Sequence, residues 1–230
     1  MKHLLPLALL LAPPAFAQTK LNLPLKRELD SIYVQDQRYR EMMMTGMGPG
    51  KAEATEAALH LAKGELGNYL STNMIRTDSS DMRRVAAIVR RYGYPGKSLV
   101  GTPTNEAVWW VIQHSNKIPQ YLPLLKAAAE TGELPFYRYA QMLDRQLMND
   151  GQEQLYGTQG KGYTVPNPAT GAPENIRFIW PIKEAARVNE RRKQAGFPTT
   201  VEENGAAIGI PYQPVTLDYA KQVQRRAQGR

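Results

Sequence analysis

Histidine is the side chain best suited to proton transfer in this sequence, which has only three histidines and no cysteine. His114 stands four residues after Trp110 in the segment AVWWVIQHS, so the two side chains share one face of a predicted helix. A partly buried imidazole can act as a general base near neutral pH. The alternative is a core histidine whose polar atoms are satisfied by hydrogen bonds. His114 is therefore the first candidate catalytic residue.

Asp144 and Arg145 are the other candidate catalytic residues. Adjacent residues on a helix point about 100° apart, so these two side chains cannot simply pair with each other. Asp144 could orient His114 or act as an acid, and Arg145 could stabilise negative charge. The alternative is a capped or solvated pair of charges.

Neutral hydrogen-bonding side chains are concentrated in GQEQLYGTQGKG, residues 151–162. Its glycines allow a ligand to approach the backbone, so the segment could bind a sugar, a peptide or an amide. Two later arginines could hold a carboxylate or a phosphate. In the alternative interpretation, the polar residues fix strand register and the arginines form a solvated helix face. The candidate ligand-binding residues are Gln113, Gln154, Tyr156, Thr158, Gln159, Arg191 and Arg192.

Metal and cofactor chemistry have no recognisable motif. The lack of cysteine excludes thiolate ligands and cysteine nucleophiles. His60 and His114 show neither H-x-x-x-H nor H-E-x-x-H spacing. There is no G-x-S-x-G, and no G-x-G-x-x-G follows a predicted strand. We therefore expect neither a metal site nor a cofactor.

The N-terminus has the features of a secretory signal peptide. Lys2 and His3 precede an apolar run, and residues 15–17 read Ala-Phe-Ala, an A-x-A cleavage motif. Cleavage after residue 17 would begin the mature protein at Gln18. The apolar run is shorter than the roughly 20 residues that cross a bilayer, and no later segment comes close to that length. We expect an exported protein, periplasmic or extracellular, without a transmembrane segment.

The mature chain is long enough for one domain with its own core, held without disulfides. Amphipathic spacing and capping residues predict mostly helices. The predicted helices cover about residues 25–44, 52–69, 80–92, 102–114, 121–129, 136–148, 184–195 and 217–228. The helix that contains the apolar run 107–112 is expected to be central. A basic C-terminal tail is expected from about residue 214.

An antiparallel hairpin is the one predicted β element. The strands are expected at about residues 152–159 and 175–182, joined by a proline-rich loop. In the second strand Ile176, Phe178, Trp180 and Ile182 alternate with other residues and form an apolar face. The fold class is therefore mainly α (α+β), as a single domain over residues 18–230.

Four short elements together resemble a known family. They are Gln-His at 113–114, Asp-Arg at 144–145, Tyr-Gly-Thr-Gln at 156–159 and Arg-Arg at 191–192. Their order resembles a bacterial family of unknown function, DUF6624, over about residues 30–197. The resemblance groups His114 with the Asp-Arg pair and the polar run, and it implies no particular reaction.

The chain also differs from that family in two places. Members often have tryptophan where Tyr94 stands, and an acidic residue soon after the histidine, where this chain has Ser115 and Asn116. The second difference removes the nearest acidic residue that could orient His114.

Two functional hypotheses follow, from different classes. The first is an exported binding module for a polar or anionic ligand such as a glycan, a peptide or a small metabolite. The alternative is a hydrolase or transferase with His114 as general base. A formal charge of +8 favours anionic partners. Nucleic acid is the weakest hypothesis, because four Arg-Arg pairs are scattered without a binding motif and the protein is expected to be exported.

Overall fold

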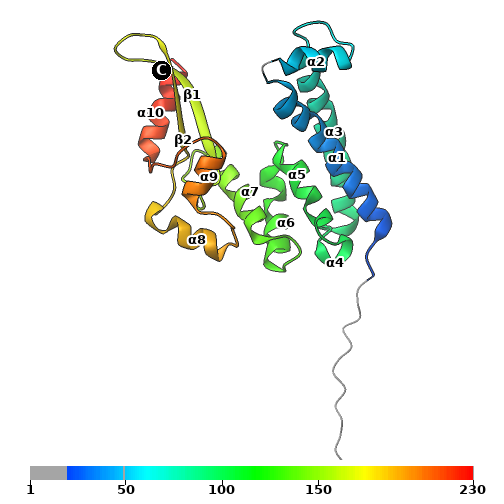
Figure 1. Cartoon of the computed structure of the whole chain (residues 1–230). Helices are drawn as coiled ribbons and strands as arrows, with labels where there is room; N and C mark the ends of the chain where they lie inside the picture. The colour runs from blue at the N-terminus through cyan, green and yellow to red at the C-terminus, as the bar shows by residue number, and fades with distance from the viewer. Residues whose placement is uncertain (1–19, 49, 230) are drawn as a thin grey trace, which may run out of the picture.

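The structure is a computed structural model that describes residues 20–48 and 50–229 (Figure 1). Helices dominate, and the strands of the described part form one two-stranded antiparallel sheet. The predicted mainly α architecture with a small hairpin is thus confirmed. The predicted signal peptide, residues 1–17, lies outside the described residues. Among the helices of the described ranges, none is both long enough and apolar enough to cross a bilayer.

The N-terminal part is a bundle built on two long helices, α1 (Leu23–Gly46) and α3 (Leu66–Tyr92). Helix α1 begins at Asn22, whose side chain accepts a hydrogen bond from the Leu25 N–H (3.1 Å). Leu25, Leu29 and Ile32 form a stripe with helical spacing and are buried in the core. Both long helices contact α5 (Ala107–Gln113). The short elements of this part are α2 (Lys51–Ala58), α4 (Lys97–Val100) and η1 (Thr104–Glu106).

Helices α6 (Ile118–Glu130) and α7 (Phe136–Asn149) form a packed pair in the middle of the molecule (Figure 1). A tight turn at Gly132, with φ of 75°, connects them. Their buried residues, including Leu125 and Met142, join those of α1, α3 and α5 in one hydrophobic core. The predicted central helix therefore lies between the N-terminal bundle and this pair.

The C-terminal part contains the hairpin, three α-helices and a short 3₁₀ helix on the other side of α7 (Figure 1). Strands β1 (Gly160–Pro166) and β2 (Pro173–Ile179) pair from Gly160 with Ile179 to Pro166 with Pro173. Helix α10 (Leu217–Ala227) packs on β1 and buries Ala220 and Val223 against Val165, Phe178 and Trp180. The remaining helices are η2 (Ala185–Arg187), α8 (Val188–Gln194) and α9 (Val201–Ala207).

Several predicted bounds differ from the structure. The first strand is at 160–166 and not at 152–159, because the backbone N–H groups of Leu155, Tyr156 and Thr158 bind the Asp144 carboxylate instead of a neighbouring strand. The second strand ends before Pro181, which has no N–H to donate. Most of the predicted basic tail is α10. Helix α9 was not predicted, although Thr200 and Glu203 form a capping box at its start.

Candidate functional site

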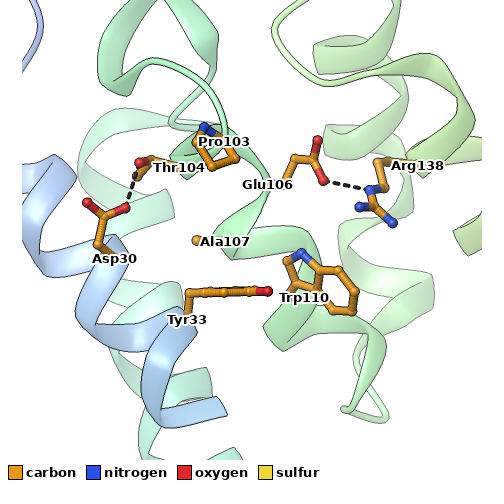
Figure 2. Close-up of a pocket in the computed structure, with 8 residues that line it drawn as sticks. All are labelled: Asp30, Tyr33, Pro103, Thr104, Glu106, Ala107, Trp110 and Arg138. Atoms are coloured by element: carbon orange, nitrogen blue, oxygen red, sulfur yellow. Dashed lines mark hydrogen bonds and ion pairs between the residues drawn. The ribbon is translucent and has the colours of Figure 1, made fainter. Parts of the chain in front are cut away.

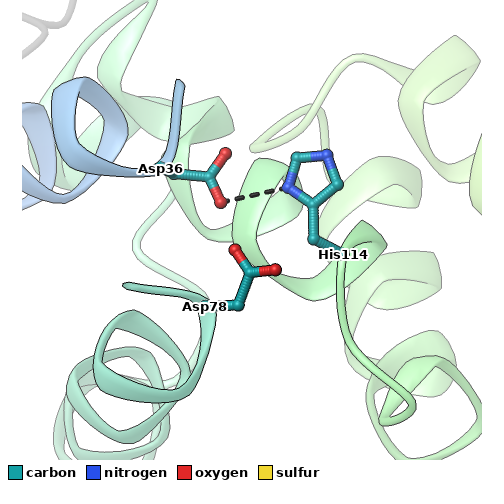
Figure 3. Close-up of side chains that lie close together, drawn as sticks. All are labelled: Asp36, Asp78 and His114. Atoms are coloured by element: carbon teal, nitrogen blue, oxygen red, sulfur yellow. Dashed lines mark hydrogen bonds and ion pairs between the residues drawn. The ribbon is translucent and has the colours of Figure 1, made fainter. Parts of the chain in front are cut away.

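His114 caps the C-terminal end of α5, and its hydrogen-bond partner is an aspartate of α1. The Nδ1 atom of His114 lies 3.0 Å from Oδ1 of Asp36 (Figure 3). Asp36 occupies the next position of the stripe formed by Leu25, Leu29 and Ile32, so its carboxylate is fully buried between the helices. The long-range packing of α1 against α5 therefore supplies the acidic partner of His114.

Two side chains of α1 hold the Asp36 carboxylate in place. Gln37 donates from Nε2 to Asp36 Oδ2 (2.6 Å), and Arg40 Nη1 lies 3.6 Å from Oδ1. Arg40 also donates to the Asp36 backbone oxygen (2.6 Å) and, through Nη2, to both oxygens of Asp78 on α3 (2.8 and 2.9 Å). One guanidinium thus connects the two carboxylates and fixes α1 against α3.

Among the residues that the structure describes, Asp36, Asp78 and His114 form a group that could hold a metal ion, because one ligand atom from each lies within 4.8 Å of the others (Figure 3). The guanidinium of Arg40 already lies against both carboxylates. It supplies the positive charge that a cation would bring, so an ion could bind only by displacing it. The geometry favours an ion-pair network at this place.

Asp81 lies one turn after Asp78 on α3 and is fully buried. Its Oδ1 accepts a long hydrogen bond from Arg84 (3.4 Å), whereas Oδ2 has no partner among the described residues. Burial raises the pKa of Asp81 to about 6, with Asp36 and Asp78 adding to the shift and Arg84 opposing it. The negative charges of Asp36 and Asp78 therefore disfavour the ionised form of Asp81.

A pocket of about 200 Å³ opens between α1, α5 and α7 (Figure 2). Tyr33 and Trp110 form one wall, with their ring centroids 5.9 Å apart in an edge-to-face arrangement. Arg138 of α7 lies over the Trp110 ring, 4.9 Å from its centroid. The residues that line the pocket are Asp30, Tyr33, Pro103, Thr104, Glu106, Ala107, Trp110 and Arg138.

The charged groups around this pocket are paired. Glu106 accepts from Arg138 Nε through Oε2 (2.7 Å). On the other side Asp30 accepts from Thr104 Oγ1 (2.6 Å) and from Lys26 Nζ (2.7 Å). The hydrogen bonds and the positive charge of Lys26 help to lower the pKa of Asp30, while its burial acts in the opposite direction. The lining therefore has two acidic groups and one basic group, and Lys26, which binds Asp30 from outside the lining, supplies the second positive charge.

The pocket and the Asp36–His114 pair lie along the same helices. Tyr33 and Asp36 are about one turn apart on α1, and Trp110 and His114 are about one turn apart at the end of α5. Helix α7 follows α5 in the same direction, since Trp109 donates to the Arg138 carbonyl (2.7 Å) and Arg145 donates to the Gln113 carbonyl (3.3 Å). Burial lowers the pKa of Arg145.

Asp144 organises the polar run and is not bonded to His114. Its buried carboxylate accepts from the backbone N–H groups of Leu155, Tyr156 and Thr158 (2.8 to 3.2 Å) and from the Thr158 hydroxyl (2.9 Å). Burial raises the pKa of Asp144, and the three backbone N–H groups oppose that shift. In the part of the chain that the structure describes, His114 is bonded to Asp36, so Asp36 and not Asp144 is placed to orient it.

The glutamines of the polar run fix its backbone. Gln154 is fully buried, donates to the carbonyls of Gln159 (2.9 Å) and Trp180 (2.6 Å), and accepts from the Gln159 N–H (2.9 Å). The Gln159 side chain donates to the Thr158 hydroxyl (2.9 Å). A side chain at Gly157 would collide with Val201 and Ile182, which approach its Cβ position to 2.6 and 2.7 Å. These contacts connect the loop to β2 and α9.

Arg191 and Arg192 bind the other side of the same loop. Arg192 is almost completely buried and donates to the carbonyls of Tyr156 and Thr199 (both 2.8 Å). Arg191 donates to the carbonyl of Leu155 (3.0 Å) and to that of Lys183. Tyr156 packs against Phe197, with ring centroids 5.8 Å apart. The arginines therefore stabilise backbone carbonyls at the positions where we expected an anion clamp.

The comparison with protein families identifies the chain. The model of the family of unknown function DUF6624 matches residues 51–206, which is more than half of the 230 residues. The chain belongs to this family. The region matched by DUF6624 contains His114, Arg145, Asp144 and the polar run, whereas α1 precedes it. No curated protein and no solved structure matches the chain.

Several residues of this site were not among the sequence candidates. They are Asp30, Tyr33, Asp36, Glu106 and Arg138. Asp36 had a detectable signal, because it continues the apolar stripe of α1 where a charged residue is unexpected. The pocket residues come from α1, α5, α7 and the η1 segment, and they have no common sequence motif. Of the four short elements singled out in the sequence, the Gln-His pair and Arg145 lie together, and Asp144 and the other two form the loop anchor.

Proposed function

We propose that the protein is an exported binding module that holds a neutral polar ligand, such as one sugar ring of a glycan, in the pocket between α1, α5 and α7. The observation that carries the proposal is the combination of two aromatic rings with two balanced ion pairs around one pocket (Figure 2). Ligand pockets commonly combine apolar walls with a few polar groups that orient the ligand.

The aromatic wall suits the flat face of a ring. Tyr33 is 39% exposed, so its ring is available to a ligand without any rearrangement of the core. Trp110 is held edge-on by Tyr33 and Trp109 and is covered by Arg138. Rigid aromatic side chains provide contact area at low entropic cost. A ligand with one apolar face would gain most from this wall.

The polar rim suits hydroxyl or amide groups better than a net charge. Glu106 uses Oε2 for Arg138, and Oε1 has no protein partner in the described ranges, so it can accept a further hydrogen bond. Arg138 donates through Nε to Glu106 and through Nη1 to Gln141 (3.2 Å), which leaves Nη2 for a ligand. A neighbouring acceptor and donor match a hydroxyl or an amide. Because the acidic groups at this rim are paired with basic groups, the rim does not favour the binding of a charged ligand.

Titration calorimetry with N-acetylglucosamine, glucose and galactose tests this proposal. We expect at least one of these sugars to bind, and Tyr33→Leu to weaken that binding about tenfold or more, because about 1.4 kcal/mol of contact energy corresponds to a factor of ten. Tyr39→Leu is the matched control, since Tyr39 lies on the same helix outside this pocket. The absence of binding by all three sugars, or an equal loss in both variants, would contradict the proposal.

A further inference from the structure

We propose that Asp36 and His114 form a second site with an activity of its own, in which His114 is a general base for the hydrolysis of a carboxylic ester and Arg145 stabilises the developing oxyanion. This activity does not depend on the pocket ligand proposed above. It rests on the geometry of three side chains from α1, α5 and α7.

The hydrogen bond to Asp36 defines the tautomer of His114. A carboxylate can only accept, so the Nδ1 atom that lies 3.0 Å from Asp36 Oδ1 carries the proton. The lone pair of the neutral ring is then on Nε2, which is the atom that a general base uses. Figure 3 shows Nε2 on the edge of the ring that faces away from Asp36 and Asp78.

The Nε2 atom is available to a reactant. The His114 side chain is 19% exposed, and within the described residues its one hydrogen bond is made through Nδ1. Asp36, in contrast, is fully buried and is held by Gln37 and Arg40. The ring therefore has one edge fixed by the core, while the side chain as a whole is partly exposed. Asp36 acts as a positioning residue for His114.

Arg145 places a positive charge at the C-terminal end of α5, against the backbone that precedes His114. Its Nη1 donates to the carbonyl of Gln113, the residue before His114 (3.3 Å). This is the one hydrogen bond that the Arg145 side chain makes with the described part of the chain, so its other guanidinium N–H groups can bind an oxyanion. A partly buried guanidinium stabilises a developing negative charge more strongly than an exposed one does.

The proposed step balances as a simple hydrolysis. His114 Nε2 takes a proton from water while the water oxygen forms a bond to the ester carbonyl carbon, whose π electrons move onto the carbonyl oxygen beside Arg145. The oxyanion then re-forms the C=O bond, the ester C–O bond breaks, and His114 returns the proton to the leaving alkoxide. Water and ester become carboxylic acid and alcohol, and the enzyme is unchanged.

The test follows multiple-turnover hydrolysis of p-nitrophenyl acetate by the mature protein. We expect hydrolysis above the rate in buffer and a loss of about tenfold or more in His114→Gln, since general-base catalysis contributes typically 10²- to 10⁴-fold. His60→Gln is the matched control, because His60 is the other histidine of the predicted mature chain. A wild-type rate no higher than that of His114→Gln, or an equal loss in His60→Gln, would overturn the proposal.

Two aspartate variants separate positioning from a purely structural role. Asp36→Asn should lower kcat with little change in KM, because it disturbs the ring that acts in the chemical step and not the binding of the ester. Asp78→Asn removes a neighbouring charge but leaves the Asp36–His114 hydrogen bond in place, so its kcat should stay near the wild-type value. Equal losses of kcat in folded samples of both variants would show that the network is only structural.

Discussion

At the residue scale, Asp81 is a buried carboxyl whose negative charge is only partly compensated. It is fully buried between α1 and α3, one of its oxygens has no partner in the described part of the chain, and its pKa is raised to about 6, first by burial. A buried carboxylate of this kind destabilises the folded state once it is ionised. Asp81 should therefore give the protein a measurable dependence of stability on pH.

The sign of that dependence follows from the two pKa values. The folded-state value of about 6 is above the reference value of 3.8, so the folded protein binds this proton more tightly than the unfolded chain does. The contribution of Asp81 to stability is present below about pH 4 and is lost as the pH rises to about 6. The stability lost over this range is on the order of 1–3 kcal/mol.

We predict that Asp81→Asn stabilises the protein at pH 7 by about 1–3 kcal/mol and has little effect near pH 4. Chemical denaturation at the two pH values measures the difference in the free energy of unfolding. Glu41→Gln, an exposed change on α1, should show no such difference. If Asp81→Asn is destabilising at pH 7, the ionised carboxylate has a stabilising partner, and the predicted pH dependence is wrong.

At the element scale, the loop of residues 151–159 is built around Asp144. Three backbone N–H groups and one hydroxyl point at one buried carboxylate, and the two arginines hold the loop carbonyls from the other side. The polar run is thus a junction between α7, the hairpin and α8. Its side chains satisfy buried backbone groups, as they must in a segment that makes no sheet.

We predict that Asp144→Ala lowers the free energy of unfolding by about 3 kcal/mol or more, because it leaves several buried N–H groups without an acceptor. Asp150→Ala, which removes an exposed aspartate at the end of the same helix, should change it by about 0.5 kcal/mol or less. Denaturant unfolding of both variants measures this contrast. Similar values for the two variants would mean that the loop does not depend on the Asp144 carboxylate.

The sequence was sufficient for elements defined by local signals. The helices near residues 25–44, 121–129 and 136–148 were predicted within a few residues, because apolar spacing and end signals agree there. The first strand was misplaced because an alternating polar run satisfies the period of a strand, while the carboxylate that binds its N–H groups comes from another helix. Local periodicity does not contain that information.

At the scale of the whole molecule, the candidate site required contacts that no local pattern provides. His114 was selected from its residue type, but its partner Asp36 lies 78 positions away in the sequence. Asp144 is the aspartate that we expected to orient His114, but its carboxylate instead accepts hydrogen bonds from the loop backbone. The pocket depends on the packing of three helices. The sequence could therefore indicate His114 as a candidate residue. It could not show which residues of other helices lie beside His114 or line the pocket.

Export is a prediction at the scale of the whole molecule. We expect cleavage between Ala17 and Gln18, so that the mature protein begins at Gln18 and is recovered outside the cytoplasm. Cell fractionation followed by N-terminal sequencing measures both. Changing Ala15 and Ala17 to leucine should block cleavage, since the site requires small residues at these positions. A full-length protein that stays in the cytoplasm would contradict export and remove the reason to expect an extracellular ligand.

An NMR titration of the indole N–H signals, with the sugar that binds best in calorimetry, most directly tests whether a sugar binds in the pocket. The chain has three tryptophans. Trp110 lines the pocket, whereas the N–H group of Trp180 donates to the Gln152 carbonyl in the C-terminal part (2.7 Å) and serves as an internal control. If the ligand binds between α1, α5 and α7, the Trp110 signal should shift saturably and the Trp180 signal should stay unchanged. An unchanged Trp110 signal, or equal shifts of both, would contradict a ligand site between α1, α5 and α7.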